Sequence, residues 1–335
     1  MIASRVRCQH AVLCVALITL VSVGTAQATK YAADFEELGA SARALGMGSA
    51  LVALPDPAAL YYNPAATGLT PGRSLMFTHA ENFGGIVKTD FLSAQLPAQP
   101  SVIGLGLYRN GVSGIKLTRL RNETLPPGTD YRLDTTINGR DTAILVTNLP
   151  IVYQTVSASD WIAYLNYARP ITNALLLGGN AKLIYRSTGV ATCFGMGLDA
   201  GLLLTLAQDL RVGLQLRNLT TSPLFWDTKT IESMGPKAVL GLSRGMALGQ
   251  DHRLLVCIQA EGELMEEYIS ENLGLEYAYR NSLFGRLGFH RGNFTFGLGG
   301  AYRRFFLDYG YETAPYTAAR DILPATQKLT GGLQF

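Results

Sequence analysis

The sequence predicts an all-β fold: a 14-stranded antiparallel transmembrane β-barrel with a small N-terminal helical plug. From Arg73 onward, apolar side chains alternate with small or polar ones before each turn signal, which is typical of strands with two different faces. The connections between these segments mostly alternate between short and long, as they do in bacterial outer-membrane barrels. The chain ends in an aromatic residue, Phe335, on the same strand face as Leu333, which is typical of the last strand of such barrels.

Residues 1–28 are predicted to be a secretory signal peptide. Two arginines precede a mostly apolar run over residues 11–23, and Ala26-Gln27-Ala28 follows as the expected cleavage site. The run is too short for a spanning helix, and Cys14 within it leaves a lipoprotein signal as the less favoured alternative. No later segment offers the roughly 18 consecutive apolar residues that a spanning helix requires. Export without a helical membrane anchor is therefore expected.

Charge and composition exclude some classes of protein. Charged residues are only 16% of the chain, and the formal net charge of +3 falls to about +1 without the two leader arginines. That balance gives no basic field for nucleic acid, so no nucleic-acid partner is predicted. Cys193 and Cys257 each lie in a strand-like run, and two buried or lipid-facing thiols are favoured over a disulfide between them.

The predicted plug covers residues 29–72, ahead of the barrel at 73–335. Within it, Asp56 followed by proline is typical of a helix N-cap with proline at the first helical position, and residues 58–62 can continue a short helix. Asn63-Pro64 should end that helix, because a residue before proline is disfavoured in the α region.

The part of the plug before this helix is rich in small residues. Residues 49–54 are predicted to be a short extended segment between glycine- and proline-marked turns. Gly46 and Gly48 are interpreted either as hinges or, with slightly more support, as turn positions at a crowded barrel wall.

Fourteen strands are predicted from the alternation and the turns. They lie near residues 73–79, 86–96, 101–109, 160–169, 173–186, 192–206, 209–219, 236–248, 252–262, 269–280, 282–291, 294–302, 305–311 and 328–335. Ten residues at about 3.3 Å each, tilted by about 40°, rise roughly 25 Å, which matches the apolar band of an outer membrane. Residues 110–159 are predicted to be one long loop on the extracellular side, although residues 143–156 could pair as a strand.

An even number of strands places both chain ends on the same side of the membrane. In a Gram-negative outer membrane that side is expected to be the periplasm, with the plug at or inside the periplasmic mouth. Membrane lipid is therefore an expected partner.

Residues 40–69, ASARALGMGSALVALPDPAALYYNPAATGL, resemble the N-terminal signature of the PorV/PorQ-type outer-membrane proteins, and Asn63-Pro64-Ala65 matches the NPA motif of that family. The resemblance is specific over these thirty residues and architectural elsewhere. It implies membership of the FadL-like long-chain fatty-acid transporter superfamily, with a 14-stranded barrel and an N-terminal plug. Its members include uptake channels for hydrophobic compounds and a shuttle protein of a bacterial secretion system.

The resemblance implies passage of hydrophobic small molecules, gated by the plug without covalent chemistry. The alternative is a non-enzymatic shuttle or scaffold of a protein-secretion system, with secreted proteins as partners. The residues proposed for the plug and gate are Gly46, Gly48, Asp56, Asn63, Pro64 and Ala65. For Asn63-Pro64-Ala65, a simple helix stop is an equally weighted interpretation.

Motifs for enzymes and metal sites fail their tests of context. Residues 241–245, GLSRG, fit the GxSxG nucleophile motif around Ser243, but that motif needs a strand-turn-helix context, and here one strand continues through it. A barrel hydrolase is therefore the weakest functional class. The three histidines after the leader are not spaced as metal ligands, and no phosphate loop occurs, so no cofactor is predicted. Glu261, Glu263, Glu266 and Glu267 are interpreted as a solvated or ion-binding surface at a loop.

Overall fold

The computed structural model describes residues 32–335 apart from 71, 208, 220, 264–268 and 315–323. The predicted signal peptide, residues 1–28, lies outside the described residues. None of the helices in the described part of the chain is long and apolar enough to cross a membrane.

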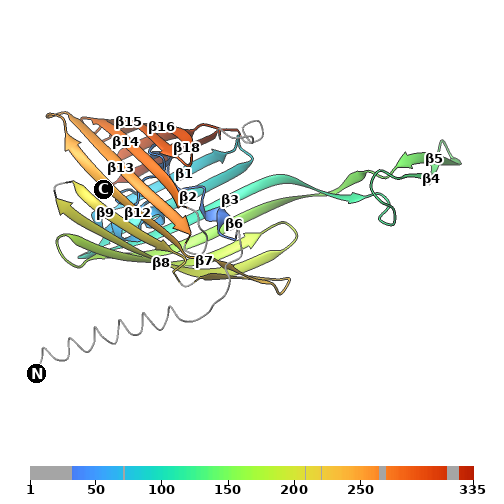
Figure 1. The fold of residues 1–335 in the computed structure, drawn as a ribbon, viewed down its shortest axis with the longest axis horizontal. Coiled ribbons are helices and arrows are strands. Elements are labelled where there is room, and N and C mark those ends of the chain that lie inside the picture. Colours follow the sequence, from blue (N-terminus) through green and yellow to red (C-terminus); the bar gives the residue numbers. More distant parts are fainter. Residues whose placement is uncertain (1–31, 71, 208, 220, 264–268, 315–323) are drawn as a thin grey trace, which may run out of the picture.

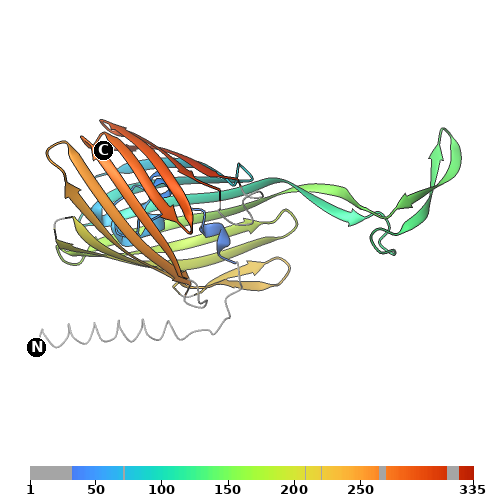
Figure 2. The same ribbon diagram turned by 45° about the horizontal axis from the view of Figure 1, so that its top comes forward.

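Fourteen antiparallel strands close into a barrel, which confirms the predicted fold class (Figures 1 and 2). The barrel strands are β1 (Ser74–Asn82), β2 (Val87–Ala98), β3 (Ser101–Leu120), β6 (Pro150–Pro170), β7 (Leu175–Ser187), β8 (Thr192–Ala207), β9 (Leu210–Arg217), β12 (Lys237–Ala247), β13 (His252–Glu263), β14 (Ile269–Tyr279), β15 (Leu283–His290), β16 (Asn293–Tyr302), β17 (Phe305–Glu312) and β18 (Thr326–Gln334). The ring closes because β1 pairs with β18, where Ser74 lies opposite Gln334. Each predicted strand overlaps one of these.

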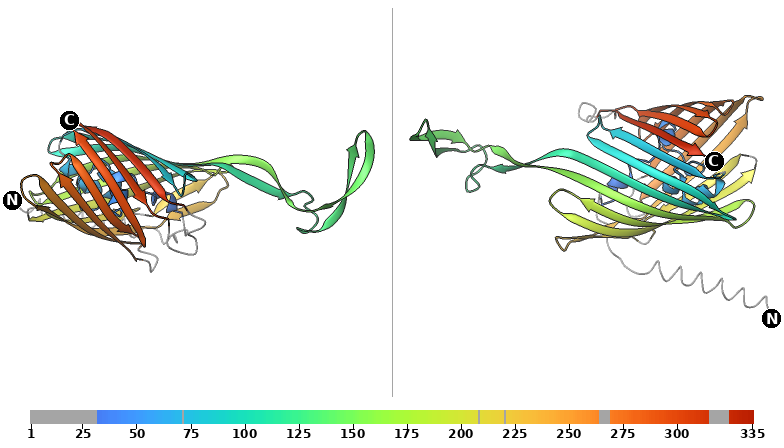
Figure 3. Two further views of the ribbon diagram at one scale, coloured as in Figure 1. Left: turned by 90° about the horizontal axis from the view of Figure 1, so that it is seen from above. Right: turned by 180° about the vertical axis from the view of Figure 1, so that it is seen from behind.

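The prediction of one long loop over residues 110–159 is wrong. β3 and β6 stay paired far beyond the barrel, from Gly111 opposite Ser159 to Leu120 opposite Pro150. A further hairpin, β4 (Asp130–Ile137) and β5 (Arg140–Thr147), follows at the tip. We call this projection the ribbon, and it leaves the rim opposite to the C-terminus (Figure 3). The connection between β9 and β12 likewise contains a hairpin, β10 (Ser222–Trp226) and β11 (Ile231–Met234), whose first strand pairs with β8.

The wall of the barrel is apolar outside and polar inside. On β14, Leu273 and Tyr277 face outward and are 49% and 41% exposed, whereas the neighbouring Asn272 and Glu276 face inward and are buried. The same alternation recurs around the ring, because successive strand residues point to opposite faces. A wall of this kind suits a surrounding apolar solvent.

The N-terminal segment, which we define as the described residues 32–70, fills the lumen (Figures 1 and 2, blue). It contains four short helices: η1 (Asp34–Glu36), α2 (Ala42–Gly46), α3 (Ala59–Tyr62) and η2 (Pro64–Leu69). The helix predicted at 58–62 is thus present as α3, ending before Asn63. The extended segment predicted at 49–54 is wrong: consecutive turns replace it, with Leu51 N donating to Ser49 O and Leu54 N to Leu51 O.

Candidate functional site

Glycines allow the backbone of the N-terminal segment to pack closely against the inner wall. A Cβ on Gly46, the last residue of α2, would lie 2.8 Å from Gly297 Cα. Gly48 adopts a φ of 60°, and a Cβ there would lie 2.5 Å from Phe289 O, while its N–H donates to Thr295 Oγ1 at 3.0 Å. Both residues therefore lie at close approaches of two backbones. The wall glycines beneath the segment are Gly178, Gly201, Gly213, Gly274, Gly288, Gly297 and Gly310.

Asn63 ties three stretches of chain together from a fully buried position. Its Nδ2 donates to Val52 O at 2.7 Å and to Leu202 O, on the wall, at 3.1 Å. Its Oδ1 accepts from Ala65 N at 3.0 Å and so caps η2, which begins at Pro64. Asn63-Pro64-Ala65 thus ends one helix and starts the next while holding the segment to the barrel.

Asp56 makes a turn hydrogen bond and an ion pair, and it is not the predicted N-cap of α3, which is Ala58. Its Oδ1 accepts from Ala58 N at 2.8 Å in the turn that leads into α3, and its Oδ2 lies 3.3 Å from Arg43 Nη1. Arg43 in turn lies 2.8 Å from Glu276 of the wall. Burial raises the pKa of Asp56 although Arg43 acts in the opposite direction.

Two neighbouring glutamates of the segment reach two different groups of wall residues. Glu36 Oε1 lies 2.7 Å from Lys182 Nζ, which is also 3.0 Å from Asp199 Oδ1. Asn218 Oδ1 accepts a further hydrogen bond from Lys182 Nζ at 2.8 Å. This first group therefore holds one cation between two carboxylates.

The second group, which we call the Glu37 cluster, consists of Glu37, Lys237, Arg217, Arg291 and Glu261. Glu37 Oε2 lies 2.5 Å from Lys237 Nζ and 2.7 Å from Arg291 Nη2, and Arg217 Nη1 lies 3.6 Å from its Oε1. Arg291 Nη2 also lies 2.7 Å from Glu261 Oε1. Burial alone would raise the pKa of Glu37, but the three cations outweigh it and lower that pKa to about 2.

Aromatic side chains and one lysine hold the stretch between η1 and α2. The ring of Tyr61 stacks on Tyr108 of β3, with centroids 5.6 Å apart. Tyr62 OH accepts from Ala40 N at 2.8 Å, and Lys328 Nζ donates to Gly39 O at 2.9 Å. Tyr61 thus packs the segment against the wall, and Tyr62 bonds the segment to itself.

A hollow of about 490 Å³ lies between η1 and the barrel wall, at the rim from which the ribbon leaves. The segment contributes Phe35 and Leu38 to it, and the wall contributes Phe83, Val87 and Val112. The polar groups at its edge include Glu37 and Arg291. We call it the inner hollow. It can hold an apolar molecule within reach of the Glu37 cluster.

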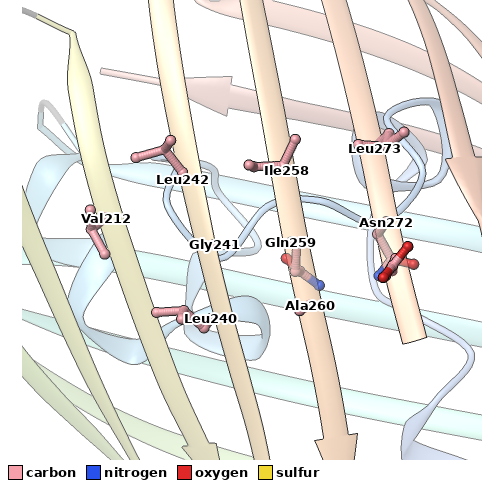
Figure 4. A pocket seen from close by; sticks show the side chains of 10 residues that line it. Val212, Leu240, Gly241, Leu242, Ile258, Gln259, Ala260, Asn272 and Leu273 are labelled. Atoms are coloured by element: carbon pink, nitrogen blue, oxygen red, sulfur yellow. The ribbon is translucent and has the colours of Figure 1, made fainter. Parts of the chain in front are cut away.

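A second hollow, of about 430 Å³, lies on the outer surface of the wall (Figure 4). Leu240, Leu242, Ile258 and Leu273 line it with outward-facing side chains. The strand ladder runs unbroken beneath it, with Gly241 opposite both Gln259 and Gly213. This hollow therefore faces the surroundings of the barrel and not its lumen.

No protein-family model matches the sequence, and no curated protein matches it. Solved structures do match. The toluene transporter TbuX of Ralstonia pickettii superposes with a TM-score of 0.54 at 13% identity, over 89% of this chain and 98% of that one. The toluene transporter TodX of P. putida gives 0.54 at 14% identity, over 89% and 99% of the two chains. The monoaromatic hydrocarbon channel CymD gives 0.52 at 11% identity, over 89% and 98%.

The fold is that of these hydrocarbon channels. At such identities the likeness concerns the fold, and it extends over nearly the whole of each matched chain. These three structures are described as toluene transporters and a monoaromatic hydrocarbon channel.

The residues that the sequence offered as catalytic or ion-binding candidates make contacts within the fold. Ser243 lies within β12, not in an elbow, and its Oγ donates to Ala53 O of the segment at 3.1 Å. Among the described residues, no three His, Cys, Asp or Glu side chains are grouped so that they could hold a metal ion. The expected solvated acidic surface is wrong for Glu261, which faces the lumen and belongs to the Glu37 cluster. Glu266 and Glu267 lie outside the described residues.

The ionic contacts of the segment were missed from the sequence. Glu36, Glu37 and Arg43 all precede the proposed gate residues in the sequence, and they belong to no motif. Their partners are charged residues at inward positions of the barrel strands, such as Lys182 and Lys237. The available signal was a charged residue at one of the small or polar positions of an alternating strand. Such a position faces the lumen, because a charge on the outward face would meet lipid.

Proposed function

We propose that this chain forms an outer-membrane channel for hydrophobic small molecules, with the N-terminal segment as the plug that gates it. The observation that carries the proposal is the inner hollow, where apolar side chains of the segment and of the wall meet. Phe35 and Leu38 lie on one side of it, and Phe83 and Val112 on the other. An apolar solute placed there would contact the segment directly. The descriptions of the structural neighbours, toluene and monoaromatic hydrocarbon channels, support the same class of solute.

Under this proposal the segment must move or loosen for a solute to pass, because its residues fill the lumen below the hollow. Gly46, Gly48, Asp56, Asn63, Pro64 and Ala65 are the proposed gate residues. Their tight backbone contacts and shared hydrogen bonds make the seated position well defined.

A disulfide lock tests the gate. Ala42 N lies 2.8 Å from Thr330 Oγ1, so the pair Ala42→Cys and Thr330→Cys would join α2 to β18. In proteoliposomes, uptake of toluene should fall when the pair is oxidised and return after reduction. Each single variant under the same oxidant is the matched control. Full uptake with the disulfide completely formed would show that the segment need not move.

We propose that both termini face the periplasm and that the ribbon lies outside the cell. Protease added to intact cells should then cut the ribbon within residues 121–149, and should leave a C-terminal tag uncut. Cleavage of the tag in intact cells would show that the C-terminus faces the outside, which contradicts the proposed orientation.

The ribbon supports a second candidate function, a shuttle or scaffold for secreted proteins as in the PorV/PorQ-type proteins that residues 40–69 resemble. It carries exposed apolar residues, including Leu145, Leu149 and Val152, far from the barrel (Figure 3). A hydrocarbon channel does not need such a surface. Replacing residues 121–149 by a short turn should leave toluene uptake unchanged. If the same replacement abolishes co-purification of exported proteins with the barrel from the outer membrane, the scaffold role is supported.

A further inference from the structure

The Glu37 cluster has the composition of an anion-binding site that is already filled. Lys237, Arg217 and Arg291 come from β12, β9 and the turn after β15, so three separate parts of the wall supply the cations. Their common carboxylate comes from the N-terminal segment. Lys237 and Arg217 are 8% and 11% exposed, which makes the site a partly desolvated one.

Cations outnumber carboxylates in the Glu37 cluster but not around Glu36. Around Glu36, the single cation Lys182 faces two carboxylates, Glu36 and Asp199. In the Glu37 cluster, three cations face Glu37 and Glu261. Without Glu37 the same wall groups would hold three cations against one carboxylate, and would attract an anion, although Arg291 is 32% exposed and its field is partly screened by water.

The filled site borders the place where an apolar solute would bind. Glu37 and Arg291 both line the inner hollow together with Phe35 and Leu38. A molecule with an apolar body in the hollow and a carboxylate at its end could place that carboxylate beside Arg291. The guanidinium, however, is already within 2.7 Å of both Glu37 and Glu261.

We propose that Glu37 occupies an anion site of the lumen wall and thereby makes the inner hollow select uncharged hydrophobic molecules over carboxylates of the same length. This inference rests on the proposed function, because it assigns the class of solute that the same hollow accepts. Glu37 is the specificity-determining residue, and Arg291 is the cation that it withholds.

The physical reason is the cost of an unpaired charge. A carboxylate that enters the hollow gives up its hydration, and it recovers that cost only by pairing with a cation. With Glu37 in place it meets a second carboxylate near the same guanidinium, which repels it. An alcohol or a hydrocarbon bears no such cost. Replacing Glu37 by glutamine keeps the shape of the side chain and frees the cations.

The test compares 4-phenylbutan-1-ol with 4-phenylbutanoate at pH 8, where the latter is ionised. Binding is measured by equilibrium dialysis against the protein in lipid nanodiscs, with empty nanodiscs subtracted. The wild-type protein should bind the alcohol at least about tenfold more tightly than the carboxylate, a difference of about 1.4 kcal/mol. Glu37→Gln should raise the affinity for the carboxylate relative to that for the alcohol by at least about tenfold, as expected for a hydrogen-bonded ion pair.

Matched variants separate selectivity from general damage. Glu123→Gln removes an exposed carboxylate from the ribbon and should change neither affinity. Glu37→Gln combined with Arg291→Gln should lose the gained carboxylate binding. If Glu37→Gln fails to fold, Glu261→Gln keeps the segment's own carboxylate and should still raise carboxylate affinity, by a smaller factor.

Equal wild-type affinity for the two compounds would overturn the inference, as would an unchanged ratio in Glu37→Gln, or no binding of either compound to any variant. Uptake of the alcohol into proteoliposomes is measured separately and tests the channel. Protein that binds both compounds in the expected ratios but transports neither would refute the proposed function and leave the role of Glu37 standing.

Discussion

Lys182 Nζ lies 2.7 Å from Glu36 Oε1, and the two side chains are 0% and 3% exposed. The lysine belongs to the wall and the glutamate to the N-terminal segment, so this ion pair joins the two across 146 positions of sequence. Asp199 shares the same ammonium at 3.0 Å. The segment therefore supplies one of the two carboxylates that neutralise this buried lysine of the wall.

Replacing Lys182 by methionine should destabilise the protein by about 3–5 kcal/mol, because it leaves two buried carboxylates without their cation. The measurement is the free energy of unfolding of the protein in lipid vesicles, from a guanidinium titration. Lys116→Met, at an exposed position of the ribbon, is the matched control and should have no effect. A loss below about 1 kcal/mol, the range of exposed pairs, would mean that Lys182 is not the buried partner described here.

Substituting Gly48 by alanine should unseat the segment. The residue adopts a φ of 60°, which costs a residue with a side chain about 1–3 kcal/mol, and its Cβ would lie 2.5 Å from Phe289 O. We expect faster proteolysis within residues 32–70 while the barrel strands stay protected. Gly285→Ala is the control, because a Cβ there meets nothing within 4 Å on the outer surface. Equal protection of both variants would argue against a tight seat at Gly48.

The barrel could be predicted from the sequence because lipid and lumen impose opposite demands on successive residues. The prediction failed for the ribbon, which lies beyond the part of the strands that separates lipid from lumen. The ribbon is solvated on both faces, so its strands lack the contrast between faces that marks β14. One local signal was present: Asn138-Gly139, with φ values of 54° and 76°, is a typical hairpin turn between β4 and β5.

The candidate site was predictable only in part. Asn63-Pro64 carries a local signal for a helix stop, and α3 does end before Asn63. The N-cap predicted at Asp56 is wrong, because Ala58 occupies that position and Asp56 accepts from Ala58 N in the preceding turn. The pairing of Glu37 with Lys237 spans 200 positions and depends on how the segment enters the lumen. Alternation shows that Lys237 and Glu261 face inward, but it does not show which residue of the segment they meet.

Changing Asn63 to aspartate should weaken the seat of the segment although the side-chain shape is kept. Asn63 Nδ2 donates to Val52 O and Leu202 O, and a carboxylate oxygen there would oppose two carbonyl oxygens. A buried unsatisfied polar group costs about 1–3 kcal/mol, and more when charged, so we expect a loss of at least about 2 kcal/mol. The same guanidinium titration measures it. Asn138→Asp, exposed at the ribbon tip, is the control; equal stability of the two variants would contradict the role given to Nδ2.

The contribution of Glu37 to stability should depend on pH in a defined direction. Lys237, Arg217 and Arg291 outweigh burial and hold its pKa at about 2, below the ordinary value of 4.5. A carboxyl whose pKa is lowered by folding adds stability above its unfolded pKa, and this stability is lost as the pH falls through the folded pKa. Wild-type protein should therefore exceed Glu37→Gln in unfolding free energy at pH 7, and the gap should shrink between about pH 4.5 and about pH 2. Other carboxyl groups titrate in both proteins, so the difference isolates this one. A gap that stays constant down to pH 3 would show that the cations do not act on Glu37 as their distances indicate.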